Sequence, residues 1–141
     1  MRKWNNVRNE VQQHAPIPEN IEKVGSIVLD SAYKIHTALG PGLLESAYET
    51  CLAFEIRQSG LTVLTQVVQP ITYNNLKIDS GYRIDLLVEN CVIVEIKAVE
   101  KTHSVHEAQL LTYMRLAGIR LGYLINFNVV QLKYGIKRMV L

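Results

Sequence analysis

Cysteine is scarce in this sequence, which has only Cys51 and Cys91 among 141 residues. Two cysteines allow one disulfide at most, and neither lies in a Cys-x-x-Cys or Cys/His spacing that suits zinc. We therefore interpret both as reduced thiols that pack in the core. Neither a disulfide framework nor a structural zinc site is expected to hold the fold together.

Long hydrophobic runs are also missing. The longest apolar stretches, such as residues 92–94, fall far short of the roughly 20 residues that cross a bilayer. Residues 1–6 carry positive charge but lead into Asn, Gln and Glu instead of an apolar segment, which argues against a secretory signal. We expect no membrane partner and, as the default, a cytoplasmic location.

Several familiar enzyme signatures are absent. The sequence has no glycine-rich phosphate loop, no Gly-x-Ser-x-Gly motif and no Cys/His nucleophile arrangement, so those enzyme classes have no support. Repeats and low-complexity runs are missing too, and 48% hydrophobic with 20% charged residues is ordinary for a globular domain. The net charge of +2 is compatible with a nucleic-acid partner but does not argue for one.

The residue patterns that are present predict one domain of mixed helices and strands. Residues 1–17 are polar and proline-bounded, and we interpret them as an N-terminal extension of a single domain over 18–141. Apolar residues at three- and four-residue steps predict helices over 18–39, from 44 to a stop at Gly60, and over 104–117, the last capped by Ser104. Alternating and β-branched stretches predict strands over 61–68, 71–73, 76–78, 82–88, 91–99, 121–127 and 136–141. This order favours an α/β (α+β) fold with a mixed sheet flanked by helices.

The predicted strand over 91–99 carries two charged residues within an apolar run. Side chains alternate along a strand, so Glu95 and Lys97 share one face. Charged side chains are seldom buried unless they are paired or bound to a metal. An edge strand with a solvated face would explain both residues without any site, and from this segment alone that interpretation is the stronger one.

Asp85 changes this balance, because it interrupts the apolar strand that precedes Glu95 in the predicted hairpin. Hard cations such as Mg²⁺ prefer oxygen ligands, so Asp85, Glu95 and the Ile96 carbonyl could bind one and leave room for a phosphate. A bound metal would polarise that phosphate and lower the pKa of an attacking water. Lys97 could orient the water or stabilise the developing charge.

The loop between these two strands decides whether the carboxylates can meet. With a two-residue loop, Glu89-Asn90, Asp85 would lie opposite Val94 and would face away from Glu95. A three-residue loop that includes Cys91 places Asp85 opposite Glu95, and a bulge would have the same effect. The site therefore predicts an odd loop or a bulge between Asp85 and Glu95.

Two segments resemble the motifs of known nucleases. Asp85 followed by Glu95-Ile96-Lys97 resembles the D…(D/E)xK signature of PD-(D/E)XK nucleases. Residues 42–48, GLLESAY, are similar to the motif that names the GxxExxY proteins, a family placed in that superfamily, and the resemblance runs from about Ile21 to Leu141. It implies a restriction-endonuclease-like fold in which Glu45 joins the metal site directly or through water.

A third motif lies in the last predicted helix. Gln109 and Tyr113 are four residues apart on one helix face and look like the QxxxY element of the RecB-type nuclease branch. By this resemblance they would hold a metal-bound water or the substrate phosphate. Ordinary helix packing with hydrogen-bonded polar tips explains these two residues and Tyr48 equally well. His103 and His106 lack a spacing that compels metal binding, and we expect solvent-exposed or capping roles for them.

The leading hypothesis is a metal-dependent nuclease that hydrolyses nucleic-acid phosphodiester bonds with Mg²⁺ or Mn²⁺. Asp85, Glu95, Ile96 and Glu45 would be the metal ligands, and the catalytic set would be Lys97, Glu45, Gln109 and Tyr113. DNA is favoured over RNA as the partner, and homo-oligomerisation stays open. The alternative is a non-catalytic nucleic-acid-binding or assembly module that retains the nuclease fold.

Overall fold

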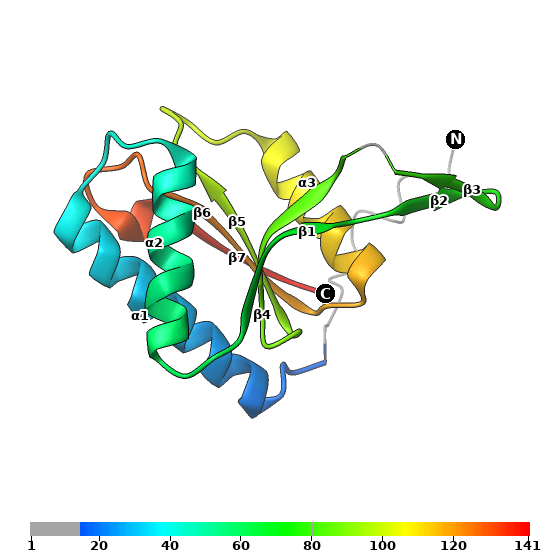
Figure 1. Cartoon of the computed structure of the whole chain (residues 1–141), viewed down its shortest axis with the longest axis horizontal. Coiled ribbons are helices and arrows are strands. Elements are labelled where there is room, and N and C mark those ends of the chain that lie inside the picture. Colours follow the sequence, from blue (N-terminus) through cyan, green and yellow to red (C-terminus); the bar gives the residue numbers. More distant parts are fainter. Residues whose placement is uncertain (1–14, 80) are drawn as a thin grey trace, which may run out of the picture.

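A five-stranded mixed sheet lies at the centre of the structure, a computed structural model that describes residues 15–79 and 81–141 (Figure 1). The strand order is β1-β4-β5-β6-β7, in which β5 and β6 are parallel and the other neighbours antiparallel. In chain order the elements are α1 (Glu19–Leu39), α2 (Glu45–Gln58), β1 (Val63–Val68), β2 (Ile71–Tyr73), β3 (Leu76–Ile78), β4 (Arg83–Val88), β5 (Val92–Lys97), α3 (Ser104–Ala117), β6 (Leu121–Asn126), the 3-10 turn η1 (Leu132–Tyr134) and β7 (Ile136–Val140). This arrangement confirms the predicted α+β fold.

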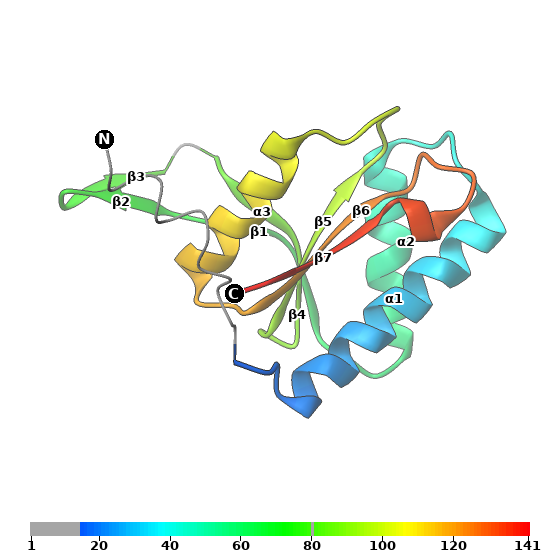
Figure 2. The same ribbon diagram turned by 180° about the vertical axis from the view of Figure 1, so that it is seen from behind.

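Helices cover both faces of the sheet. In both ribbon views α1 and α2 lie on one side of it and α3 on the other (Figures 1 and 2). Along β5, Val94 and Ile96 join the core under α1 and α2, whereas Ile93 joins the core under α3. A strand buried on both faces reads as a continuous apolar run, which is why 92–94 contains no polar residue.

A two-stranded hairpin extends the β1 and β4 ribbon beyond the main sheet (Figure 1). Its turn is Asn74-Asn75, whose φ angles of 45° and 65° are both positive, as a tight type I′ turn requires. The turn joins the two strands that the sequence predicts over 71–73 and 76–78. Tyr73 and Leu76 flank the turn and are largely exposed.

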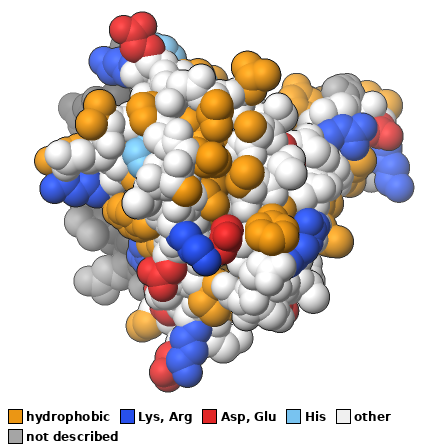
Figure 3. Space-filling model, turned by 60° about the vertical axis from the view of Figure 1, so that its left-hand side comes forward, with side chains coloured by type: hydrophobic (Ala, Val, Ile, Leu, Met, Phe, Trp, Pro, Cys, Tyr) orange, Lys and Arg blue, Asp and Glu red, His pale blue; other side chains and the backbone are white. Residues whose placement is uncertain are grey.

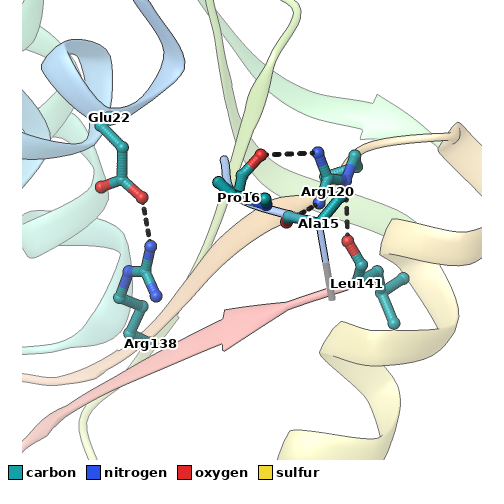
Figure 4. A network of polar contacts seen from close by, with 6 residues as sticks. All are labelled: Ala15, Pro16, Glu22, Arg120, Arg138 and Leu141. Carbon is teal, nitrogen blue, oxygen red and sulfur yellow. Dashed lines mark hydrogen bonds and ion pairs between the residues drawn. The ribbon is translucent and has the colours of Figure 1, made fainter. Parts of the chain in front are cut away.

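The chain before α1 is tied to the end of the sheet (Figure 4). Arg120 donates hydrogen bonds to the carbonyls of Ala15, Pro16 and Leu141, and a second arginine, Arg138 on β7, pairs with Glu22 of α1. Residues 15–17, which the sequence assigns to an extension, therefore contact the domain. Residues 1–14 of that extension lie outside the described residues, so the boundary at 17/18 stays a prediction.

The outer side of α1 and α2 is partly apolar (Figure 3). A shallow groove of about 460 Å³ runs between the two helices, and Leu39 and Phe54 on its walls are 41% and 56% exposed. In the described ranges no helix is both long and apolar enough to cross a membrane.

Local expectations differ from the structure in a few places. The helix over 104–117 has His103, not Ser104, at its N-cap position. The His103 N–H donates a hydrogen bond to the His106 ring. His106 takes the place that Glu or Gln has in a capping box, because its unprotonated Nδ1 can accept the N–H of the N-cap residue. Cys51 and Cys91 are free, as predicted, although both are only half-buried at the margin of the core.

Candidate active site

The loop between β4 and β5 has three residues, Glu89, Asn90 and Cys91, so the odd loop predicted from the sequence is confirmed. Val88 pairs with Val92, and the register continues through Leu87–Ile93 and Leu86–Val94. Two successive residues with positive φ, Glu89 at 49° and Asn90 at 53°, turn the chain within this length. One step beyond the paired register, Asp85 lies opposite Glu95.

At Asp85 and Glu95 the two strands are joined by side-chain hydrogen bonds instead of backbone ones. The Asp85 N–H donates to Glu95 Oε1 at 3.2 Å, and the Ile96 N–H donates to Asp85 Oδ2 at 2.8 Å. Each carboxylate thus accepts a hydrogen bond from the backbone of the opposite strand, at the point where β4 and β5 separate. The two side chains thus satisfy backbone N–H groups that the strand pairing leaves free at this point.

Glu95 is 3% exposed and belongs to a strand flanked on both sides, by β4 and β6. The edge-strand interpretation of this segment is therefore wrong. Burial, followed by the negative charge of Asp85, raises the pKa of Glu95 from an ordinary 4.5 to about 8, while the Asp85 N–H and Lys97 partly oppose the shift. Ionised Glu95 thus lacks sufficient positive charge around it.

Glu45 reaches this end of the sheet from the first residue of α2. Its carboxylate accepts a hydrogen bond from the Ala98 N–H at 3.3 Å, directly beyond β5. Together with Asp85 it lines a pocket of about 620 Å³, which we call the acidic pocket; its walls are Leu43, Leu44, Glu45, Ser46, Glu49, Gln66, Asp85, Ile96 and Ala98. Residues far apart in the sequence thus meet on one surface. That Glu45 joins a metal site there stays a prediction.

Two residues of the acidic pocket were missed by the sequence reasoning. Glu49 lies one helical turn after Glu45, and its pKa is raised chiefly by burial, with Asp85 and Glu45 adding to the shift and a hydrogen bond from Gln66 opposing it. The Gln66 amide links the acids, since it donates to Glu49 at 2.9 Å and to Asp85 at 3.2 Å. The four-residue spacing from Glu45 could have indicated Glu49. Nothing in the sequence marks Gln66, whose φ of 52° is unusual for a residue within a strand.

The GLLESAY segment has a structural role that explains its glycine and tyrosine. Gly42 has a φ of 103°, a region that other residues rarely adopt. Tyr48 is fully buried, donates a hydrogen bond to the Gly40 carbonyl at 2.5 Å and accepts one from the Leu43 N–H at 3.2 Å. Its ring stacks on Phe127 with centroids 4.6 Å apart. Tyr48 therefore fixes the loop that delivers Glu45, which confirms the packing interpretation of this residue.

Gln109 and Tyr113 face the site from α3. The Gln109 amide donates to the Tyr113 hydroxyl at 3.0 Å. Tyr113 is 3% exposed, and burial raises the pKa of its hydroxyl, with the hydrogen bond from Gln109 opposing the shift and the charges of Glu95 and Asp85 adding to it. The pair is therefore packed, with its polar tips joined, and lies near both carboxylates. Its role toward water or phosphate stays a prediction.

Lys97 and the two histidines lie at the rim. Lys97 ends β5 on the Glu95 side and is half-buried. The pKa of His106 is lowered by burial first and then by Lys97 and His103, with Glu45 opposing, so His106 is near both the lysine and the acidic pocket. Sequence reasoning left both histidines outside the site, and His106 does accept the capping hydrogen bond from the His103 N–H at 3.1 Å.

The donor set suits a hard divalent cation in its chemistry. Asp85, Glu95 and Glu45 supply carboxylate oxygens, and a cation would supply the charge that buried Glu95 lacks. The Ile96 N–H points at Asp85, and the N–H and C=O of one strand residue point to the same side, so the Ile96 carbonyl is directed to the same gap. Within 15–79 and 81–141, however, no group of three or more His, Cys, Asp or Glu side chains is already arranged to hold an ion.

The comparison with protein families agrees with this geometry. A family model described as the PD-(D/E)XK nuclease superfamily matches residues 22–139, which include β1 to β6, most of β7 and every residue that lines the acidic pocket. The narrower resemblance to GxxExxY proteins stays a prediction. No curated protein and no solved structure gives a significant match. The chain belongs to the PD-(D/E)XK nuclease superfamily.

Proposed function

We propose that this protein is a metal-dependent nuclease that hydrolyses phosphodiester bonds of nucleic acid at the opened end of β4 and β5. The observation that carries the proposal is the position of Asp85 opposite Glu95, directly after the last apolar pair of β4 and β5. Superfamily membership supports nucleic acid as the substrate class. DNA is favoured over RNA as the substrate.

In this proposal Asp85, Glu95, Glu45 and the Ile96 carbonyl would hold one Mg²⁺ or Mn²⁺. When bound, the ion would supply Lewis-acid polarisation of the phosphate and a lowered pKa for the attacking water. Glu49 is a further carboxylate within reach of the acidic pocket. The hydrogen bonds that Asp85 and Glu95 now accept from strand amides keep the two carboxylates oriented before any ion arrives.

The remaining residues orient groups around the ligands. Lys97 has a flexible ammonium on the Glu95 face, so it can orient a water or stabilise charge that develops on the phosphate. Gln109 and Tyr113 present an amide and a hydroxyl from the other side of the sheet, and these can position the same water or a phosphate oxygen. Tyr48 acts only through the loop that it fixes.

The test is a Mn²⁺-dependent cleavage assay on single-stranded DNA, double-stranded DNA and RNA. Wild-type protein is compared with Lys97→Ala and with the control Lys133→Ala, which removes an exposed lysine of η1 that lies outside the acidic pocket. Cleavage that requires Mn²⁺, survives in the control and is lost in Lys97→Ala supports the proposal. If wild type and Lys97→Ala cleave equally, the activity belongs to a contaminant and the proposed site is wrong.

A second candidate is a non-catalytic nucleic-acid-binding or assembly module. The observation that favours it is the engagement of Asp85 and Glu95 with strand amides, together with the lack of a ready-made ion-binding group among the described side chains. Titration calorimetry separates the two candidates. Mn²⁺ binding that disappears in Asp85→Asn supports the nuclease, whereas nucleic-acid binding without any uptake of Mn²⁺ or Mg²⁺ supports the module.

A further inference from the structure

A second pocket lies directly beside the acidic pocket, and its lining combines one lysine, two histidines and one carboxylate. It has a volume of about 770 Å³ and is lined by Val99, Glu100, Lys101, His103 and His106, the segment that leads from β5 into α3. The two pockets meet along the backbone, because Ala98 lines the acidic pocket and the next residue, Val99, lines this one. We call it the histidine pocket.

A buried asparagine fixes the backbone of one wall of the histidine pocket. Asn126, which is 4% exposed, accepts a hydrogen bond from the Val99 N–H at 3.1 Å and donates one to the Val99 carbonyl at 2.9 Å. The same side-chain oxygen accepts the Asn128 N–H at 3.2 Å. A buried amide that satisfies both backbone groups of one residue fixes the path of the chain there. The segment is therefore a built wall of the pocket.

The pocket presents hydrogen-bond donors. His106 Nδ1 accepts the His103 N–H at 3.1 Å, so this nitrogen carries a lone pair and the neutral ring bears its proton on Nε2. That N–H donor stays available at neutral pH without any charge on the ring. Lys101 adds an exposed ammonium, and the His103 ring lies 5.7 Å from that of His106, centroid to centroid. Glu100 contributes one exposed carboxylate to the rim.

The two pockets differ in the groups that they offer to a phosphate. The acidic pocket contains the carboxylates of Glu45, Glu49 and Asp85, and no lysine or arginine is among the residues that line it. A nucleic-acid strand carries a phosphate at every nucleotide, so a strand that enters the acidic pocket must have its neighbouring phosphates paired elsewhere. The histidine pocket is the adjoining surface, and its Lys101 ammonium and His106 N–H can donate to such a phosphate.

We propose that Lys101, His103 and His106 form a phosphate subsite that binds the nucleic-acid strand one or more nucleotides from the phosphate held at the acidic pocket. This inference rests on the proposed function for the identity of its ligand. The phosphate can be an internal phosphodiester or the terminal phosphate of a strand, since the donors are the same for both.

The test measures binding apart from cleavage. Fluorescence anisotropy with short labelled oligothymidylate and oligouridylate, each with and without a 5′-phosphate, is recorded in EDTA. Against wild type, His106→Glu should weaken binding at least about tenfold, because a carboxylate repels phosphate. Lys101→Gln should weaken it about three- to tenfold and lower the salt-dependence slope by about 1. The control Lys133→Gln should stay within about twofold.

His106→Glu also separates binding from folding. Glutamate at the third position of a helix keeps the acceptor for the capping N–H and favours the helix start, so the thermal unfolding temperature should not fall. Loss of affinity at full stability supports the subsite. A loss confined to the 5′-phosphorylated probes assigns it to a terminal phosphate, and an equal loss for both kinds of probe assigns it to an internal one.

Two results overturn the subsite. One is binding of the variants with wild-type affinity, and the other is no binding of any probe by the wild type. Neither depends on catalysis. If the pocket variants lose affinity but the wild type cleaves nothing with Mn²⁺, the subsite stands and the nuclease proposal fails. If Mn²⁺-dependent cleavage is present and the variants bind normally, the nuclease proposal stands and the subsite is wrong.

Discussion

The two ends of the β4 and β5 hairpin have nearly opposite chemistry although they follow one another directly in the register. At the loop end Val88–Val92, Leu87–Ile93 and Leu86–Val94 pair as buried apolar residues. At the other end Asp85 and Glu95 take over hydrogen bonds that the ladder would otherwise make. The difference indicates that the loop end supplies stability and register, whereas under the proposed function the open end serves chemistry at some cost in stability.

The largest effect should come from Asp85→Asn at the open end. If the proposed function is right, this change removes a ligand charge at nearly constant volume and should reduce Mn²⁺-dependent cleavage by at least about 100-fold. The fold should be kept, because an amide oxygen can still accept the Ile96 N–H. Initial cleavage rates and urea unfolding are measured together. Loss of activity with a large loss of stability would contradict the proposed division between the two ends.

Ile93→Ala tests the closed end. Ile93 is fully buried in the core under α3, so its truncation should leave a cavity and lower the free energy of unfolding by about 2–5 kcal/mol. Chemical denaturation provides the measurement. Under conditions where the variant remains folded, its cleavage rate should stay near that of wild type, since the side chain lies in the core and not in the acidic pocket. If Ile93→Ala lost as much cleavage activity as Asp85→Asn, the two ends of the hairpin would not differ in function as described.

Much of this contrast could be predicted from the sequence. Periodicity located the helices and strands, and the chemistry expected of Asp85 and Glu95 required a three-residue loop, which the register confirms. The motif resemblance predicted that Glu45 lies near Asp85, and both line the acidic pocket. Gln66 could not be found in this way, because its role depends on a positive φ inside a strand and on its contact with Glu49, both set by tertiary packing. The burial of Glu95 was also missed, since neighbouring strands, not the local pattern, decide which strand is central.

The pH dependence of stability measures the cost of burying Glu95 at the open end. The pKa of Glu95 is about 8 in the folded protein and about 4.5 when the chain is unfolded. Below pH 4.5 Glu95 is protonated in both states; between 4.5 and 8 the unfolded chain releases its proton while the folded protein retains it. The Glu95 contribution to stability should therefore fall across this window by up to a few kcal/mol. Glu95→Gln, which cannot ionise, should lack this loss.

The measurement is urea unfolding of wild type and Glu95→Gln at pH 5 and pH 8.5. The difference in unfolding free energy should shift in favour of the variant at the higher pH, and Mn²⁺ should reduce that shift by stabilising ionised Glu95 in the wild type. Groups common to both proteins cancel in this comparison. A difference that stays constant with pH would show that burial of Glu95 carries no ionisation cost.

The smallest effect is expected at the loop itself, with Asn90→Gly. Asn90 is exposed and has a φ of 53°, a conformation that costs an ordinary residue about 1 kcal/mol, asparagine less and glycine essentially nothing. Because glycine also loses more backbone entropy on folding, the net change in unfolding free energy should be within about 0.5 kcal/mol. The loop keeps three residues, so Asp85 should remain opposite Glu95 and cleavage should be unchanged.

Deletion of Asn90 is the matched control, since a two-residue loop would shift the register by one and turn Asp85 away from Glu95. If the deletion leaves Mn²⁺ binding intact, the register is not what assembles the site.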